Sequence, residues 1–183
     1  MEEIKLVFIG SSGVGKTNII RILLGKDYDD LIESRMSASF NSKSIEIEGH
    51  LYTAELWNTA GKTHYMHLTK IFLKDAKGIF VVFDITDKNS FDEVDEWIKL
   101  VKEAQIIDIP IMLIGNKGDE FLREKITDEQ GKLKAKEYGA DYIRTSAKYN
   151  DTKNIQKALE ILMKKVIKKK LKENKKNKYD EKK

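Results

Sequence analysis

Eight residues near the N-terminus constrain this chain more than any other feature. Residues Gly10–Thr17 read GSSGVGKT and fit the pattern G-x-x-x-x-G-K-[S/T]. An apolar run, Lys5–Ile9, precedes them, and a segment of helical periodicity, Thr17–Leu24, follows. A glycine-rich turn between a buried strand and a helix can wrap its backbone N–H groups around an anion. An ordinary glycine turn before a helix is the alternative at this point.

The residue types in this loop indicate a bound triphosphate. Lys16 is expected to reach the β- and γ-phosphates, which also makes it a candidate catalytic residue, and the Thr17 hydroxyl is expected to ligate Mg²⁺. The N-terminus of the following helix adds partial positive charge. The residues expected to bind the phosphates are Ser12, Gly13, Val14, Gly15, Lys16, Thr17 and Asn18.

Strand-length apolar runs alternate with helix-period segments along the rest of the chain. The further predicted strands are Ser44–Ile47, Tyr52–Trp57, Ile79–Phe83, Ile111–Ile114 and Tyr142–Ile143. The first two flank a turn at Glu48–Gly49 and predict a hairpin. This alternation favours an α/β fold with a mainly parallel sheet, one antiparallel strand and helices on both faces.

Two helix starts carry the pattern of a capping box, in which two side chains satisfy free backbone donors at the first turn. Ser90 is paired in this way with Glu93, and Thr127 with Gln130. Apolar residues at helical spacing between Ile155 and Ile167 predict one face of a last helix.

The charge distribution divides the chain near residue 168. The net charge is +4, but residues 164–183 hold eleven lysines against three acidic residues, which makes this segment +8 and the rest of the chain −4. The apolar periodicity stops at about the same place. We therefore expect one domain over residues 1–167 and a lysine-rich, disordered tail over residues 168–183. Such a tail can attract anionic lipid weakly, whereas the acidic body gives no reason to expect specific nucleic-acid binding.

Two short motifs after later strands indicate which base is bound. Residues 116–119 read NKGD, and the Asp119 carboxylate suits guanine, which offers N1–H and N2–H₂ side by side. Lys117 can lay its stem along the purine, and the leading asparagine can brace the loop. Residues 145–148 read TSAK, and the small Ala147 lets a backbone N–H approach guanine O6. Either motif alone could be a polar turn, but their order after successive strands favours guanine.

Taken in order, GSSGVGKT, LWNTAG, GIFVVFDIT, SFDEVDEWI, IGNKGD and TSAK resemble the Ras-superfamily small GTPases over about residues 4–167, most closely the Rab branch. The resemblance implies a P-loop NTPase fold with a six-stranded sheet and five helices. It also implies a GTP/GDP switch carried by two mobile loops, with vesicle trafficking as its setting. By resemblance, the nucleotide is held by Lys16, Thr17, Gly61, Asn116, Lys117, Asp119, Ser146, Ala147 and Lys148, with Mg²⁺ on Thr17.

Three positions depart from the family pattern. The aspartate of the family's D-T-A-G is Asn58, the glutamine that orients the attacking water is Lys62, and the Mg²⁺-binding threonine of the first switch loop falls on Arg35. Asn58 brings no charge to Mg²⁺, and Lys62, the second candidate catalytic residue, donates hydrogen bonds without accepting any. Arg35 could itself reach a phosphate, or a neighbouring serine could serve Mg²⁺. We expect good GTP/GDP binding, weakened Mg²⁺ binding and slow hydrolysis.

Partner proteins are expected to bind through the switch loops. Phe40, Trp57 and Tyr65 stand where Rab relatives carry an aromatic patch that effectors read, although Phe40 and Trp57 could be ordinary strand residues. Two other functions stay open. A non-hydrolysing pseudo-GTPase that serves as an interaction module is favoured by Asn58, Lys62 and Arg35, and a P-loop ATPase or kinase is disfavoured by both base motifs.

The composition excludes several further classes. Cysteine is absent, so the chain offers no disulfide, no thiolate metal site and no cysteine for a prenyl anchor. No apolar run approaches the roughly 20 residues of a membrane span, and the first residues, MEEIKLVFIG, do not read as a signal peptide. The expected location is the cytoplasm, with peripheral association with endomembranes as its extension.

Overall fold

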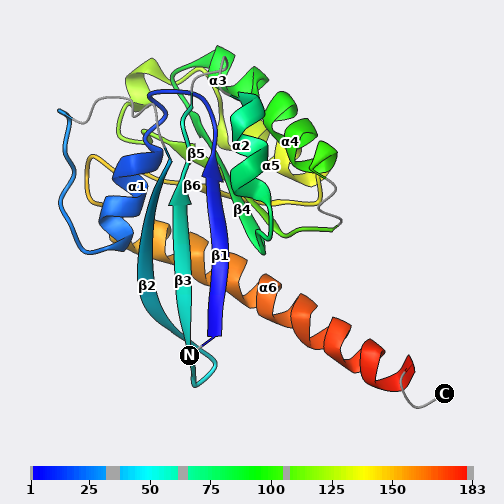
Figure 1. The fold of residues 1–183 in the computed structure, drawn as a ribbon. Helices are drawn as coiled ribbons and strands as arrows, with labels where there is room; N and C mark the ends of the chain where they lie inside the picture. The colour runs from blue at the N-terminus through cyan, green and yellow to red at the C-terminus, as the bar shows by residue number, and fades with distance from the viewer. Residues whose placement is uncertain (1, 32–37, 62–65, 105–107, 181–183) are drawn as a thin grey trace.

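The computed structural model describes residues 2–31, 38–61, 66–104 and 108–180, and helices cover both faces of one sheet (Figure 1). The strands are β1 (Glu2–Ile9), β2 (Ser39–Ile47), β3 (His50–Asn58), β4 (Gly78–Asp84), β5 (Ile111–Asn116) and β6 (Asp141–Arg144). The helices are α1 (Lys16–Leu23), α2 (Met66–Leu73), α3 (Lys88–Asp92), α4 (Val94–Glu103), α5 (Asp128–Glu137) and α6 (Thr152–Asp180), with a 3₁₀ turn at Phe121–Arg123. Since α3 and α4 are one segment interrupted at Glu93, the described residues give the five helices expected.

The six strands lie in the order β2-β3-β1-β4-β5-β6. All neighbouring pairs are parallel except β2 with β3, so the predicted mainly parallel sheet with one antiparallel strand is confirmed. Because five strands point the same way, their carboxyl ends meet along one edge of the sheet, where ligands bind in folds of this class.

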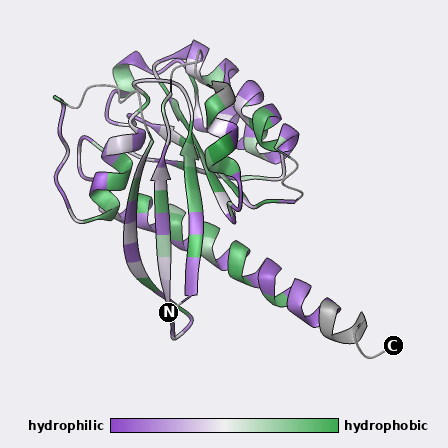
Figure 2. Ribbon diagram, in the orientation of Figure 1, coloured by the Kyte–Doolittle hydropathy of each residue, from purple (hydrophilic) through white to green (hydrophobic). Residues whose placement is uncertain are grey.

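Two apolar clusters pack on the two faces of the sheet. In β1 the side chains alternate, so that Leu6 and Phe8 join the cluster beneath α1 and α6, whereas Val7 and Ile9 join the cluster beneath the helices from α2 to α5. Figure 2 shows long hydrophobic stretches in β1 and β4. Burial on both faces explains why these strands read as continuous apolar runs in the sequence.

The predicted hairpin is present and longer than expected. Glu48 and Gly49 form its two-residue turn with φ of 52° and 77°, and antiparallel pairing runs from Ile47 opposite His50 to Ser39 opposite Asn58. The sequence shows only part of this length, because β2 alternates between exposed and half-buried residues and carries a weak apolar pattern.

One of the two predicted capping boxes is confirmed. Thr127 Oγ1 accepts a hydrogen bond from the backbone N of Gln130 at 3.3 Å, and Gln130 Oε1 accepts one from the backbone N of Thr127 at 2.8 Å. These two bonds fix the start of α5.

The capping box at Ser90 and Glu93 is wrong. The helix starts earlier, at Lys88, because Asp87 caps it by accepting a hydrogen bond from the backbone N of Asn89 at 3.0 Å. Ser90 therefore lies inside α3. The Glu93 carboxylate instead accepts a hydrogen bond from the Ser11 hydroxyl in the loop after β1.

The last helix, α6, extends as far as Asp180, although the sequence predicted a disordered tail from residue 168. Lys169 Nζ donates to the backbone O of Asp108 at 2.9 Å, and Lys170 Nζ lies 2.6 Å from Glu2 Oε1. Lysine and glutamate are good helix formers and can extend a helix beyond the core. An apolar pattern reports only the turns that face the core, so the helix end predicted from it is too early here. Within the described residues, no helix is both long and apolar enough to cross a bilayer.

Candidate functional site

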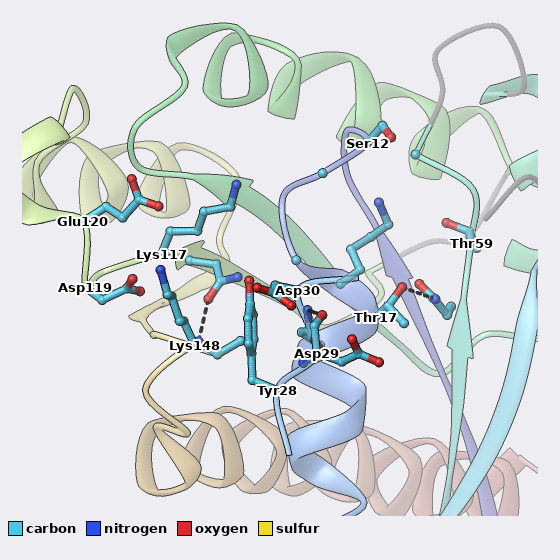
Figure 3. Close-up of a pocket in the computed structure, with 18 residues that line it drawn as sticks. Ser12, Thr17, Tyr28, Asp29, Asp30, Thr59, Lys117, Asp119, Glu120 and Lys148 are labelled. Atoms are coloured by element: carbon cyan, nitrogen blue, oxygen red, sulfur yellow. Dashed lines mark hydrogen bonds between the residues drawn. The ribbon is translucent and has the colours of Figure 1, made fainter. Parts of the chain in front are cut away.

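A pocket of about 230 Å³ opens where β1, β3, β5 and β6 end (Figure 3). Figure 3 shows Lys117, Asp119 and Lys148 on one side of it and Thr17 and Thr59 on the other. The structure thus gathers the glycine-rich loop and both later motifs in one place. The predicted residues that line the pocket are Ser12, Gly13, Gly15, Lys16, Thr17, Asn18, Gly61, Asn116, Lys117, Asp119, Ala147 and Lys148.

The shape of the loop after β1 depends on two glycines with left-handed backbone angles. Gly10 has φ of 135°, and a Cβ there would lie 2.1 Å from the backbone O of Val82. Gly15 has φ of 101°, and a Cβ there would lie 2.2 Å from Asn116 Nδ2. Both positions therefore require glycine for backbone angle and for space. The loop is consequently packed against the ends of β4 and β5.

Lys16 is buried at the centre of this loop, with only 6% of its surface exposed. Its Nζ donates to the backbone O of Gly10 at 2.7 Å and of Ser11 at 2.8 Å. Burial lowers the pKa of Lys16 to about 7, because a charged ammonium loses hydration here and gains only neutral carbonyl partners. An anionic ligand would supply the opposite charge that this ammonium lacks.

Helix α1 begins directly after Gly15, and no side chain caps it. The backbone N–H groups of its first turn are therefore donors that a ligand can use, and the helix dipole favours an anion at this end. The helix start and the Lys16 ammonium face the same pocket, so both favour a phosphate group there.

Thr17 and Asn58 form the part of the site where a metal is expected. Asn58 Nδ2 donates to Thr17 Oγ1 at 2.8 Å, and Asn58 is buried with 4% of its surface exposed. Its Oδ1 is buried without a hydrogen-bond partner among the described residues. A hydroxyl oxygen and an amide oxygen are hard donors of the kind that Mg²⁺ accepts, so these residues fit Mg²⁺, but neither carries charge.

The described residues contain no cluster of three or more histidine, cysteine, aspartate or glutamate side chains that could hold a metal. A cation in this pocket would therefore take most of its ligands from phosphate oxygens and water, as Mg²⁺ does at nucleotide sites.

Asn116 connects the three motifs. Its Nδ2 donates to the backbone O of Val14 at 2.9 Å, and its Oδ1 accepts from Thr145 Oγ1 at 3.0 Å and from the backbone N of Ala147 at 3.2 Å. The expected brace is present in this geometry. The backbone N–H of Ala147 itself already donates to Asn116, so a base could only share this donor.

The expected base-reading side chains have polar partners that orient them. Ser146 Oγ donates to Asp119 Oδ1 at 2.6 Å, which fixes the carboxylate through one oxygen. Lys117 Nζ lies 2.6 Å from Asp84 Oδ2, an ion pair that sets the direction of the lysine stem. Ser146 and Val14 do not line the pocket themselves; the first acts through Asp119 and the second through its carbonyl, because its side chain is buried in the core.

Five lining residues were not predicted: Tyr28, Asp29, Asp30, Thr59 and Glu120. Residues 28–30 reach the pocket because Asn18 holds the backbone of Asp29 twice, with Nδ2 donating to its O at 2.9 Å and Oδ1 accepting from its N at 3.0 Å. Asn18 thus acts by positioning this segment as well as by lining the pocket. Of these five residues, only Tyr28 had a signal in the sequence, because it closely follows Gly25, the residue expected to end the first helix.

Three sequence predictions, for Arg35, Lys62 and Tyr65, lie outside the described residues. Of the expected partner-binding aromatics, Phe40 and Trp57 are cross-strand neighbours in β2 and β3, with ring centroids 5.2 Å apart. Phe40 is half exposed, and Trp57 also contacts Phe72 of α2 with ring centroids 6.1 Å apart. The rings of Phe40 and Trp57 on the sheet and of Phe72 on α2 together form an aromatic surface.

Comparison with known proteins gives one family. The sequence model of the Ras family matches residues 5–168. The Ras-related protein Rab-13 of Mesocricetus auratus is 33% identical over 163 residues, which covers 89% of this chain and 79% of the relative. The Ras-related proteins Rab-15 of Rattus norvegicus and Homo sapiens are 36% identical over 143 residues, covering 78% of this chain and 68% of each relative.

Fold, pocket and relatives agree. The match covers most of β1, the other five strands and the loops that line the pocket, and proteins of this family are GTPases that bind GTP and GDP with Mg²⁺. The chain therefore belongs to the Ras family of small GTPases, and its similarity to Rab proteins places it nearest the Rab branch.

Proposed function

We propose that this protein is a GTP/GDP-dependent binding switch in vesicle trafficking, with weakened Mg²⁺ binding and slow intrinsic hydrolysis. The observation that carries the proposal is the contact between Asn58 Nδ2 and Thr17 Oγ1 at 2.8 Å. It brings a neutral amide to the hydroxyl that is expected to hold the metal, where the family pattern has a carboxylate. The phosphate and base motifs around it are complete.

Nucleotide binding would use groups that already face the pocket. Phosphate oxygens would replace the carbonyls of Gly10 and Ser11 as acceptors for Lys16, and the opposite charges would offset the cost of burying the ammonium. Asp119 would accept from the guanine N1–H and N2–H₂ groups, and the Tyr28 ring offers an aromatic face to the base.

Mg²⁺, when bound, neutralises charge on the phosphate oxygens during transfer. Thr17 and Asn58 would hold it through neutral oxygens. The electrostatic attraction that a carboxylate gives is then missing, so its affinity falls.

Slow hydrolysis follows from Lys62 together with Asn58. Attack on the γ-phosphate needs a water held by a hydrogen-bond acceptor, and an ammonium group has no acceptor. Lys62 could pair with the γ-phosphate instead and so stabilise the GTP-bound protein. The reaction itself, cleavage of GTP by water to GDP and phosphate, is that of the family.

The test begins with the nucleotide that the purified protein carries, identified by ion-exchange chromatography after gentle denaturation. Single-turnover GTP hydrolysis is then compared with a variant in which Lys62→Gln and Asn58→Asp are combined. We expect a guanine nucleotide, and a rate at least about tenfold higher in the variant. The matched control combines Lys132→Gln with Asn89→Asp, the same changes at exposed positions.

The outcomes separate the parts of the proposal. Equal rates in the wild-type protein and the Lys62→Gln, Asn58→Asp variant would show that these two residues do not slow hydrolysis, and a wild-type rate equal to that of ordinary family members would show that slow hydrolysis is wrong. A protein that is empty and refuses added guanine nucleotide would contradict the switch. That result would leave the second candidate, an interaction module without hydrolysis, which the neutral contact of Asn58 with Thr17 also favours.

The setting in vesicle trafficking rests on the Rab relatives. Under this proposal the protein acts at the cytoplasmic face of endomembranes, and the lysines of residues 168–183 add weak attraction to anionic lipid. Effectors would read the aromatic surface around Phe40 and Trp57 in the GTP state. Fractionation of cells that express the protein should recover part of it with membranes, in an amount that falls with salt.

A further inference from the structure

A second concave surface lies far from the nucleotide pocket. A groove of about 520 Å³ separates the β2–β3 turn, at Ile47 and Glu48, from the stretch of α6 between Lys164 and Lys175. Strand β3 begins at this turn and ends at Asn58 in the nucleotide pocket, so the two sites lie at opposite ends of one strand. None of the residues lining one site lines the other.

The floor of the groove is apolar. Ile47 is buried in the main core cluster, and Ile167 packs against that cluster from α6. Leu171 lies one helical turn further along and is 56% exposed. The floor is thus continuous with the core at one end and opens to solvent at Leu171, where an apolar side chain from outside could bury it further.

Lysines surround this floor. Lys164, Lys168, Lys172 and Lys175 recur at spacings of four and three residues and therefore share one side of α6. None of them takes part in an ion pair within the described part of the chain.

Two further lysines of α6 have acidic partners that fix the helix to the body. Lys165, which also lines the groove, pairs with Asp141 at 2.5 Å, and Lys170, which does not line it, pairs with Glu2 at 2.6 Å. The helix is therefore held in place beside the groove, while the charges of Lys168 and Lys172 remain available to a ligand.

We propose that this groove is a docking site for an acidic amphipathic segment of a partner protein. One apolar side chain of that segment would enter beside Leu171, and its carboxylates would pair with Lys168 and Lys172. Complementary charge around an apolar anchor is how amphipathic helices bind grooves.

The groove fits a peptide better than a bilayer. A flat lipid surface cannot follow a concave floor, whereas one side chain of a peptide can enter it. An interfacial helix also needs a broad apolar face, whereas Leu171 is the one apolar residue in the sequence 168–176. The test must therefore distinguish binding of lipid from binding of the peptide.

The probe is a fluorescently labelled synthetic peptide that forms a helix with glutamates on one side and leucines on the other. Its anisotropy is measured with the full chain, in parallel with a peptide of the same composition whose leucines are dispersed. Vesicles of phosphatidylcholine and phosphatidylserine in a four-to-one ratio test the lipid alternative by co-sedimentation. All measurements are repeated with GDP and with a non-hydrolysable GTP analogue.

Two variants test the groove. Lys168→Glu combined with Lys172→Glu should weaken binding of the amphipathic peptide by about tenfold or more, because two attractions become repulsions. Leu171→Ser should weaken it without changing charge. The matched control combines Lys132→Glu with Lys136→Glu, an exposed pair at the same spacing on α5, and should change binding by less than about twofold. Circular dichroism checks that each variant is folded.

The proposal is supported if the amphipathic peptide binds the wild-type protein more tightly than the groove variants by these factors. Its affinity should also be the same with GDP and with the GTP analogue. It is overturned if the control pair weakens binding as much as the groove pair, or if the dispersed peptide binds equally well. It is also overturned if the vesicles bind through Lys168 and Lys172 while the peptide does not bind. None of these results depends on GTP hydrolysis.

Discussion

At the residue scale, the proposed weakening of Mg²⁺ binding rests on Asn58. It occupies a buried position against Thr17, and its Oδ1 is buried without a hydrogen-bond partner among the described residues. A carboxylate at the same place would add a full negative charge without changing the size of the side chain. The metal affinity of this protein is therefore expected to depend on a single replaced atom.

Asn58→Asp should strengthen Mg²⁺ binding by about tenfold, the effect of one added charge at short range in a partly hydrated site. The measurement is the rate at which a fluorescent GDP analogue dissociates as free Mg²⁺ is titrated; the midpoint should move to lower Mg²⁺. Asn89→Asp, on the exposed side of α3, adds the same charge elsewhere and should leave the midpoint unchanged. If both variants shift it equally, the net charge and not the site is responsible.

Gly10 makes a second prediction at this scale. Gly10→Ala should lower the free energy of unfolding by more than about 2 kcal/mol, because the new Cβ would overlap the backbone O of Val82. Gly25→Ala is the control, since Gly25 has φ of 72° but no atom within 4 Å of the new Cβ. Its cost should be about 1 kcal/mol of backbone strain. Urea unfolding of both variants compares the two, and equal costs would contradict the clash.

At the element scale, the local sequence predicted one helix start correctly and another wrongly. Thr127 and Gln130 form their capping box because no stronger cap precedes them. Ser90 and Glu93 carry the same pattern, but Asp87 stands three residues earlier and caps the helix first. A pattern of two residues cannot show which of several polar residues begins the helix, because that choice depends on where β4 ends.

Asp87→Ala should lower the free energy of unfolding by about 1 kcal/mol, the usual value of a lost N-cap. Lys88→Ala removes only an exposed ion pair with Asp92 at 2.8 Å and should cost less than about 0.5 kcal/mol. Thermal unfolding of the two variants measures the difference. A larger cost for Lys88→Ala would mean that the helix start is assigned wrongly.

The site shows the same limit of prediction. Residues inside a sequence motif, such as Lys16 and Asn116, could be assigned from their spacing because each motif is a continuous loop. Tyr28 and Glu120 could not, because they reach the pocket through tertiary contacts such as the hold of Asn18 on Asp29. The mainly parallel sheet and the apolar face of the last helix could be predicted from apolar periodicity, whereas the full length of α6 depends on contacts that periodicity does not report.

At the scale of the whole molecule, the pocket joins segments from both halves of the chain. Val14 and Asn116 are 102 residues apart and are linked by one hydrogen bond. A ligand that contacts the glycine-rich loop and both base motifs therefore stabilises the whole fold against unfolding.

GDP at about a hundred times its dissociation constant should raise the melting temperature by about 5–10 °C, the equivalent of about 2.7 kcal/mol for a chain of this size. ATP at the same concentration should raise it by much less, because Asp119 disfavours adenine. Calorimetry with the two nucleotides makes the comparison. A larger shift with ATP would contradict the assignment of guanine.

Helix α6 runs past the end of the sheet as one straight element (Figure 1). From Ile167 to Asp180 its axis advances by roughly 20 Å, at 1.5 Å per residue. The far end of a flexible segment of equal length would sample many distances from the sheet. A helix keeps that end at one distance and in one direction. Anything bound near Asp180 is thus held at a fixed distance and in a fixed direction from the nucleotide-binding domain.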